Sequence, residues 1–334
     1  DFGNDYPVMA LFEQSRPLNF SKKVSEKIGL VDTVYFNTTV PSEITKSVRF
    51  YKYLDSLEYF DCGDCEVNAQ KLAGKLRASY IQIRDAYTNF AGSVVTKNGT
   101  FLMFEKDRNL FYIREHKPGR VVAHVDNVIA LGHAFVYTFS HWFYDFLAPL
   151  TMFPEELIQK SYYVINRDRA LCEETLGIFG VKKDHILSVE KDEWVRATNT
   201  YAAVNPTPHF GHFGTCMLNL SRLFHKYYNL SSIESKEYLL SNRKKGLRRH
   251  ITNFDEVVSA IRAEYRHINF TVVDDIQSSL NETARTWASA KLMFMPTGSN
   301  FIKNLFMHPN SIIVVGLANE RDGCIAMTAA SHGV

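Results

Sequence analysis

The chain has 334 residues, which is more than one hydrophobic core usually serves and suggests two domains. With 46% hydrophobic and 22% charged residues, its composition is that of an ordinary globular protein and excludes a disordered or fibrous one. The formal net charge of +2 is too small to favour nucleic acid or an anionic membrane as the main partner. Any electropositive site must therefore be local.

The N-terminal part of the chain has little regular patterning before residue 66. Residues 66–90 carry apolar side chains at helical spacing without proline, which predicts a helix. Residues 92–106 predict a hairpin, because the pair Asn98-Gly99 lies between two runs rich in strand-forming residues. Residues 121–133 predict a strand with a bend.

From residue 139 onward, helices and strands are predicted to alternate, which favours a mostly parallel sheet. The expected helices are 139–150, 169–180, 254–265, 279–290 and 300–307, and residues 218–236 are expected to form a connecting helix and a polar linker. The expected strands are 161–166, 185–189, 200–205, 237–242, 268–275, 291–296 and 311–316. Three strand–helix units followed by a strand are enough for a small doubly wound domain at 236–334, and we assign a first domain to residues 1–225.

The loop after the strand 291–296 reads Thr297-Gly298-Ser299-Asn300. Ligands of open parallel sheets bind beyond the carboxyl ends of the strands, where loops lead into helices. Gly298 lets the backbone approach a ligand, Ser299 or Asn300 can cap the helix, and the helix start attracts an anion. The alternative is a capped turn with no ligand.

A dense basic segment follows the strand 237–242, which places positive charge at the same edge of the sheet. Arg243, nearest the strand end, is best placed to bind a diphosphate, whereas Lys245 and Arg249 can be solvated surface residues. The predicted donor-binding residues are Asn242, Arg243, Lys244, Arg248, Thr297, Gly298, Ser299 and Asn300.

The helix 139–150 is apolar except on one face, where His141, Tyr144, Asp145 and Ala148 lie at helical spacing. A mainly buried helix with His and Asp on one face is typical of a cleft wall, since buried charged groups need partners. The alternative is a His–Asp pair satisfied within the core.

Three segments together resemble glycosyltransferase family 61, the group that includes plant xylosyltransferases and the EGF-domain and O-mannose-linked N-acetylglucosaminyltransferases. They read HWFYDFLAP, SNRKKGLRRHITNFDE and TGSNFIKNLFMHPNSIIVV, in the family's order, over roughly residues 120–330. The family often has His-Gly-Ala-Gly where this chain has Thr297–Asn300, and an acidic residue in the last strand where this chain has Val315 and Gly316.

The resemblance implies a GT-B architecture, in which two Rossmann-like domains face each other across a cleft. It also implies inversion at the anomeric carbon, with UDP-N-acetylglucosamine or UDP-xylose as donor and a glycan or glycoprotein as acceptor. The N-terminal domain would then serve the acceptor and the C-terminal domain the nucleotide sugar. His141 and Asp145 are the candidate base pair, with either residue taking the proton.

No metal is expected, because the chain has no Asp-x-Asp motif; Asp274 and Asp275 are adjacent and end a strand. Arg243, Lys244 and the start of the last helix can take the role of the cation. His209 and His212 have no acid or cysteine nearby. Together with Tyr144, these two histidines are assigned to the acceptor side of the cleft.

The compartment is inferred from glycosylation sequons and cysteines. Cys62 and Cys65 form a C-x-x-C pair that reads as a local disulfide or as simple thiols, and together with the sequons this favours the lumen of the secretory pathway, in the Golgi or endoplasmic reticulum, or secretion. The sequence is compatible with removal of an N-terminal membrane anchor that preceded Asp1. The sequons begin at Asn19, Asn37, Asn98, Asn219, Asn229, Asn269 and Asn281.

Two other classes compete with an enzyme of this family. A non-catalytic glycan- or nucleotide-binding relative is compatible with the altered loop at Thr297–Asn300. An unrelated α/β hydrolase is disfavoured, because the chain has no G-x-S-x-G motif.

Overall fold

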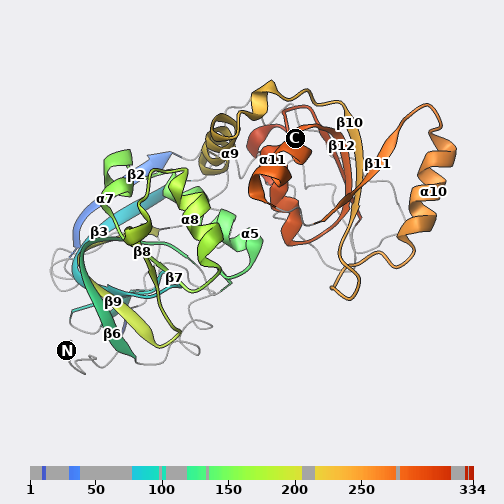
Figure 1. Cartoon of the computed structure of the whole chain (residues 1–334). Helices are drawn as coiled ribbons and strands as arrows, with labels where there is room; N and C mark the ends of the chain where they lie inside the picture. Colours follow the sequence, from blue (N-terminus) through green and yellow to red (C-terminus); the bar gives the residue numbers. More distant parts are fainter. Residues whose placement is uncertain are drawn as a thin grey trace. The chain divides into compact units, whose positions relative to one another are not determined.

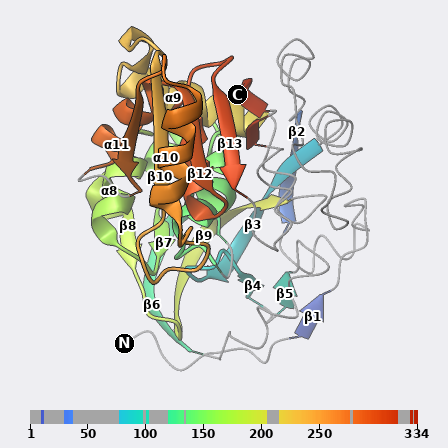
Figure 2. The same cartoon turned by 90° about the vertical axis from the view of Figure 1, so that its right-hand side faces the viewer.

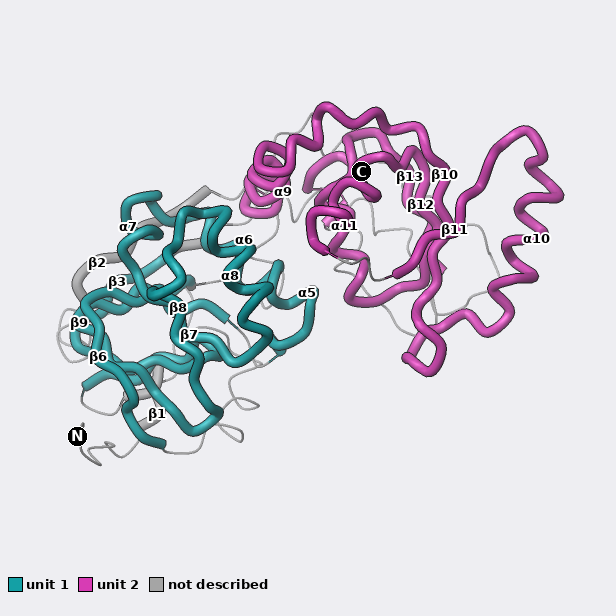
Figure 3. The backbone as a smooth tube through the Cα atoms, viewed as in Figure 1, with its two compact units in different colours: residues 1–38, 76–212 teal, residues 39–75, 213–334 magenta. Residues whose placement is uncertain are grey.

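The computed structural model describes residues 10–12, 30–37, 77–97, 100–102, 119–132, 135–204, 215–275, 279–316, 328–329 and 331–334. The chain forms two compact units (Figure 3). The first comprises residues 1–38 and 76–212, and the second comprises residues 39–75 and 213–334. Within the described residues, none of the helices combines the length and apolar character needed to cross a membrane.

The first unit is built on a mixed sheet whose central strand, β9 (Glu193–Val204), pairs antiparallel with β3 (Arg77–Thr88) and parallel with β6 (Arg120–Ala130) (Figure 1). The outer strands complete the sheet beyond β3. They are β2 (Leu30–Asn37), β4 (Val94–Thr96), β5 (Thr100–Leu102) and β1 (Ala10–Phe12).

Strand β3 shows that the helix predicted over 66–90 is wrong where the chain is described. Ile81 and Ile83 are fully buried, whereas Gln82 between them is partly exposed, so this stretch alternates with a period of two. β3 pairs with β2 on one side and with β9 on the other. Because both neighbours lie far away in the sequence, tertiary pairing overrides the local helical propensity.

The predicted hairpin is confirmed by the antiparallel pairing of β4 with β5. Its turn, Asn98-Gly99, lies outside the described residues.

The first unit also contains four parallel strands. β7 (Tyr163–Ile165) pairs with β8 (Ile186–Ser188), and a bridge between Val128 and Tyr162 joins β6 to the start of β7. The order β8-β7-β6-β9 is the 3-2-1-4 arrangement of a doubly wound domain, in which ligands bind beyond the carboxyl ends where the order reverses. The chain leaves β6 at this edge and enters the helix that begins at Phe139.

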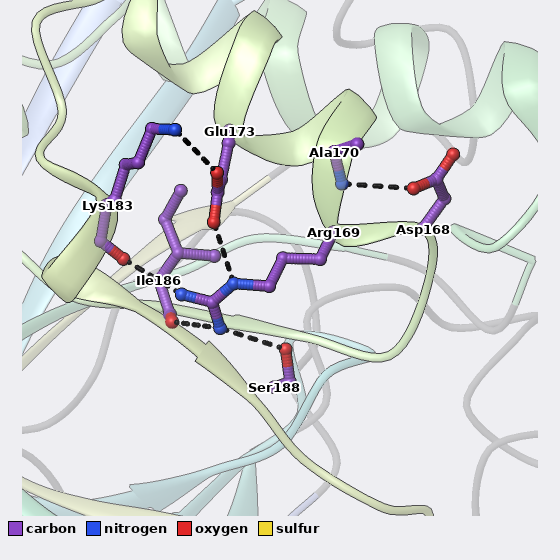
Figure 4. Close-up of polar contacts among 7 residues, drawn as sticks. All are labelled: Asp168, Arg169, Ala170, Glu173, Lys183, Ile186 and Ser188. Atoms are coloured by element: carbon purple, nitrogen blue, oxygen red, sulfur yellow. Dashed lines mark hydrogen bonds and ion pairs between the residues drawn. The ribbon is translucent and has the colours of Figure 1, made fainter.

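Helix α8 (Arg169–Gly177) is attached to β8 by Arg169, as Figure 4 shows. The Arg169 guanidinium pairs with Glu173 at 2.7 Å and donates to the carbonyl oxygens of Ile186 and Lys183. Asp168 caps the helix by accepting from the Ala170 N–H. Two further short elements of this unit are α7 (Glu155–Lys160) and η2 (Lys183–His185).

The second unit contains a fully parallel four-stranded sheet in the order β11-β10-β12-β13. The predicted strands are confirmed as β10 (Glu237–Asn242), β11 (Phe270–Asp274), β12 (Ala290–Pro296) and β13 (Ile312–Gly316). The helices between them are α10 (Phe254–Glu264), α11 (Leu280–Ala288) and the 3₁₀ helix η4 (Ser299–Phe306), and α9 (Thr215–Tyr227) and η3 (Leu230–Ser232) precede the sheet.

Helices cover both faces of this sheet (Figures 1 and 2). On one face α10 packs its Val258 against Leu240 and Phe270. The other face carries Leu239, Met293 and Met295, and α11 and η4 lie on this side. The protein is therefore mixed α/β, as the sequence predicts, and the second unit has the doubly wound arrangement with its order reversing between β10 and β12.

Candidate active site

The loop after β10 is shaped by Asn242, the last residue of that strand. Its Oδ1 accepts from the N–H of Arg243 at 2.8 Å and of Ile251 at 3.0 Å, and its Nδ2 donates to the Ile251 carbonyl at 2.9 Å. His250 Nδ1 lies 2.5 Å from the Arg243 carbonyl oxygen. The Asn242 side chain thus links the two ends of the basic segment, Arg243 and Ile251, and closes the segment into a loop.

The closed loop brings two arginines against Gly298, which follows β12. A Cβ at Gly298 would lie 2.9 Å from Arg243 Nη1 and 3.2 Å from Arg249 Nη1. Gly298 has φ 141° and ψ −170°, a conformation that is essentially restricted to glycine. The structure therefore brings together Arg243 and Gly298, as the sequence predicts, and adds Arg249, which sequence reasoning treated as a surface residue.

The other predicted cations of this loop are Lys244 and Arg248. Both are exposed, as is Lys245, whereas the atoms nearest to a Cβ at Gly298 belong to Arg243 and Arg249. The local reason is the turn at Gly246, with φ 88°, which precedes Arg249 at φ 65° and returns the chain toward the sheet. Arg243 and Arg249 are therefore the residues of this segment that the structure places against the glycine.

Helix η4 begins at Ser299 as a 3₁₀ helix rather than the α-helix that the sequence suggests. Its N-cap is Gly298, and neither Ser299 nor Asn300 acts as a side-chain cap there. The Phe301 N–H donates to the Gly298 carbonyl at 2.9 Å, which fixes the first turn. Thr297, at the end of β12, is fully buried and its N–H donates to the Gly316 carbonyl at 2.9 Å.

Asp275 and Lys303 are site residues that sequence reasoning missed. Asp275 follows β11, is 9% exposed, and its Oδ1 accepts from Asn300 Nδ2. Lys303 is 4% exposed; its Nζ donates to the Asp275 carbonyl and lies 3.9 Å from Asp275 Oδ1. The available signal was one charged residue in the segment Ser299–Phe306 and an acid at a strand end.

Burial sets the pKa values of this pair. It lowers the pKa of Lys303 to about 8, a shift that Asp275 opposes and the nearby Arg243 reinforces. It also raises the pKa of Asp275, against the opposing influence of Lys303, Arg243 and Asn300. Arg243, Lys303 and Asp275 therefore interact electrostatically, and positive charge predominates.

Arg243 Nε, Asp275 Oδ2 and Thr297 Oγ1 are buried polar atoms of this region with no hydrogen-bond partner within the described part of the chain. Unpaired buried polar atoms cost stability and call for an explanation such as a bound molecule. These three atoms belong to residues that follow β10, β11 and β12, which are neighbours in the sheet. They lie at the carboxyl ends of these strands, which is where a doubly wound domain binds its ligand.

In the first unit, the predicted helix 139–150 is confirmed, but its middle is a π-helix. It consists of α5 (Phe139–His141), the π segment η1 (Trp142–Leu147) and α6 (Ala148–Leu150). Pro149 has no N–H, so the hydrogen bond that an α-helix would form to the Asp145 carbonyl is missing. The Ala148 N–H donates to the carbonyl of Phe143, five residues earlier, which is the hydrogen bond of a π-helix. π segments of this kind are frequent at functional sites.

The predicted His141–Asp145 pair is formed. His141 Nδ1 lies 2.5 Å from Asp145 Oδ2, and because a carboxylate only accepts, the Nδ1–H donates and Nε2 is left as the basic nitrogen. Asp145 is 4% exposed and Tyr144 is 7% exposed, whereas the His141 side chain is 24% exposed. Solvent thus reaches the pair through His141 rather than along the whole polar face that the sequence suggests.

Arg167, at the carboxyl end of β7, holds the loop that precedes this helix. Its Nη1 donates to the Val136 carbonyl at 3.0 Å and lies 3.5 Å from the carbonyl of Thr138, the helix N-cap. Its Cζ lies 4.9 Å from the centroid of the Trp142 ring. Sequence reasoning did not identify Arg167, since the contacts span about 30 residues of chain.

His209 and His212 lie outside the described residues. In the described part of the chain, no group of three or more His, Cys, Asp or Glu side chains is arranged to hold a metal ion.

The model of the family described as Glycosyltransferase 61 matches residues 139–314. The chain belongs to glycosyltransferase family 61. The matched region begins with the helix that carries His141 and Asp145 and extends into β13, past Arg243, Asp275 and Gly298. No curated protein sequence matches the chain. Membership of family 61 supports glycosyltransferase activity in general, and with it a nucleotide-sugar donor and a glycan acceptor.

Proposed function

We propose that the protein is an inverting, metal-independent glycosyltransferase that moves N-acetylglucosamine or xylose from a UDP-sugar to a glycan or glycoprotein. The observation that carries this proposal is the set of unpaired buried atoms Arg243 Nε, Asp275 Oδ2 and Thr297 Oγ1 beside Gly298. A polar ligand with an anionic group fits a site with two arginines and such unpaired atoms.

The diphosphate of the donor is assigned to Arg243, Arg249 and the backbone at Gly298. Arginine matches phosphate oxygens in a bidentate manner, and a glycine allows the phosphate to approach the chain closely. Lys303 adds a buried positive charge. These groups stabilise the charge that develops on the departing UDP, which is the role that a divalent cation has in metal-dependent transferases. We therefore propose that no metal is required.

The acceptor hydroxyl is activated, in this proposal, by His141. Asp145 accepts from Nδ1 and holds the imidazole in the tautomer whose Nε2 can take a proton. The reaction is then a single displacement: the acceptor oxygen forms a bond to the anomeric carbon, the bond to the UDP oxygen breaks, and the acceptor proton passes to His141. Charge developing on the imidazolium is stabilised by the buried Asp145.

The displacement requires His141 and Arg243 to act on one donor, so the proposal includes the GT-B arrangement of the two units. It also places the protein in the lumen of the secretory pathway. Exposure of three sequon asparagines supports this location, because an acceptor for N-glycosylation has to lie at the surface. These residues are Asn229, Asn269 and Asn281.

Thermal unfolding with and without nucleotide sugars tests the proposal. UDP-N-acetylglucosamine or UDP-xylose at 100 times its Kd should raise stability by about 2.7 kcal/mol, and EDTA should leave this shift unchanged. Loss of the shift in EDTA would contradict metal independence. Stabilisation without hydrolysis or transfer to any acceptor would instead favour a non-catalytic binding protein.

A further inference from the structure

The polar contacts of the Asp275 carboxylate are uneven. Its Oδ1 accepts from Asn300 Nδ2 and lies 3.9 Å from Lys303 Nζ. Its Oδ2 is buried and has no hydrogen-bond partner within the described part of the chain. The oxygens of an ionised carboxylate accept hydrogen bonds and cannot donate them. A ligand group that contacts Oδ2 therefore has to be a hydrogen-bond donor.

The position of Asp275 in the sheet indicates which part of a nucleotide would supply that donor. Asp275 comes directly after β11, and β11 lies beside β10, whose following loop carries Arg243. In doubly wound domains the phosphates bind near the loop of the first strand and the start of a helix, and the ribose hydroxyls bind an acid near the second strand. In this unit β10 is the first strand of the sheet along the chain and β11 is the second. The loop after β10 therefore corresponds to the phosphate position, and the residue after β11 corresponds to the ribose position.

Charge selects the same part of the ligand. A diphosphate would be repelled by the Asp275 carboxylate, whereas the two adjacent hydroxyls of a ribose can donate to it. The neighbouring acid Asp274 is in register with Asn242 and is exposed, with the opposite side-chain orientation expected of consecutive strand residues. Asp275 alone of the two is buried beside Asn300 and Lys303.

We propose that Asp275 binds the ribose hydroxyls of the donor nucleotide through Oδ2 and so makes the protein selective for ribonucleotides over 2′- or 3′-deoxyribonucleotides. This inference rests on the proposed function, since it assigns a second contact in the same donor site. Asn300 and Lys303 position the carboxylate from its Oδ1 side and from the backbone.

Isothermal titration calorimetry with UDP, 2′-deoxy-UDP, 3′-deoxy-UDP and inorganic pyrophosphate tests this assignment. The wild-type protein should bind UDP at least about tenfold more tightly than one of the deoxy analogues, because a hydrogen bond to a charged group is lost. Asp275→Asn should reduce this preference to less than about threefold while pyrophosphate binding persists. Asp274→Asn, the same change at the adjacent residue, should keep the wild-type preference.

The outcomes separate the two proposals. Equal affinity of the wild-type protein for UDP and both deoxy analogues would overturn the ribose assignment and leave the diphosphate site intact. Failure of both UDP and pyrophosphate to bind would contradict the proposed function itself. The comparison of ligands on the wild-type protein does not depend on how well Asp275→Asn folds, so the ribose assignment is tested even if that variant is unstable.

Discussion

Gly298 and Arg243 are in such close contact that no side chain fits between them: a Cβ at 298 would lie 2.9 Å from Arg243 Nη1. The contact joins the loops that follow two neighbouring parallel strands, β10 and β12. The positive φ of Gly298 and the position of the guanidinium are therefore parts of one arrangement.

Gly298→Ala should weaken UDP binding, because the new methyl group displaces Arg243 and the backbone is strained by roughly 1–3 kcal/mol. Gly246→Ala is the matched control, since Gly246 also has a positive φ, 88°, but a Cβ there would meet nothing within 4 Å. Calorimetry should show weaker UDP binding for Gly298→Ala only. Equal affinities for the two variants would remove Gly298 from the donor site.

Arg243→Ala should lower the affinity for UDP by about 1.5–3 kcal/mol, because a charge-assisted hydrogen bond to the diphosphate is lost. Lys245→Ala, which removes an exposed charge from the same loop, serves as the control and should have a much smaller effect. The measurement is calorimetric titration with UDP. Unchanged affinity in Arg243→Ala would show that this arginine does not bind the nucleotide.

Lys303 should make UDP binding depend on pH above neutrality. Its pKa is lowered to about 8 by burial, so the free protein loses this positive charge as the pH rises from 7 to 9. The Kd of UDP should increase over that interval, and Lys303→Met should remove most of this dependence. Lys291→Met, at an exposed position on β12, should keep the wild-type profile. A wild-type Kd that is constant from pH 7 to 9 would contradict a role for Lys303 charge in binding.

Asp145→Asn should spare UDP binding and lower the rate of transfer by roughly 10²- to 10⁴-fold, the range expected when general-base catalysis is lost. The amide can donate to His141 and so no longer fixes the tautomer that carries a basic Nε2. Single-turnover transfer measured beside calorimetric binding distinguishes the two effects. Retained turnover would place the base at another residue.

Stability should fall between pH 6.5 and 4, because His332 is buried and desolvation disfavours its charged form more than the hydrogen bond with the Asn304 carbonyl favours it. Burial lowers its pKa from 6.5 to about 4, so the unfolded chain binds the proton first and acid favours unfolding. Burial also lowers the pKa of His225. For His332 alone, the loss at pH 4.5 is on the order of 2–3 kcal/mol.

Urea unfolding at pH 7, 5.5 and 4.5 measures this loss, and His332→Gln should make the decline shallower. The carboxylates of Asp85 and Glu193, whose pKa values are lowered by hydrogen bonds, lose their contribution at still lower pH. These two carboxylates therefore contribute little to the decline between pH 6.5 and 4.5, and the difference between the wild-type protein and His332→Gln measures the part due to His332. An unchanged slope in His332→Gln would exclude His332 as the cause.

Much of the second unit follows from its sequence. Each strand and helix predicted between residues 237 and 316 is present, because short apolar runs alternate with helical segments and their boundaries carry polar or turn residues. The His141–Asp145 contact follows as well, from a spacing of four residues on one helix. These relationships are local, so the spacing of residues along the chain is enough to predict them.

Long-range relationships were decided by the tertiary structure. Residues 77–88 form a strand because β2 and β9 pair with them, and Arg249 reaches Gly298 because Asn242 closes the intervening loop. Asp275 follows β11, whereas Asn300 and Lys303 lie in η4 after β12, so they meet only because these two strands, on either side of β10, end at one edge of the sheet. Periodicity identifies each element, but the register of strands distant in the chain determines which side chains share a site.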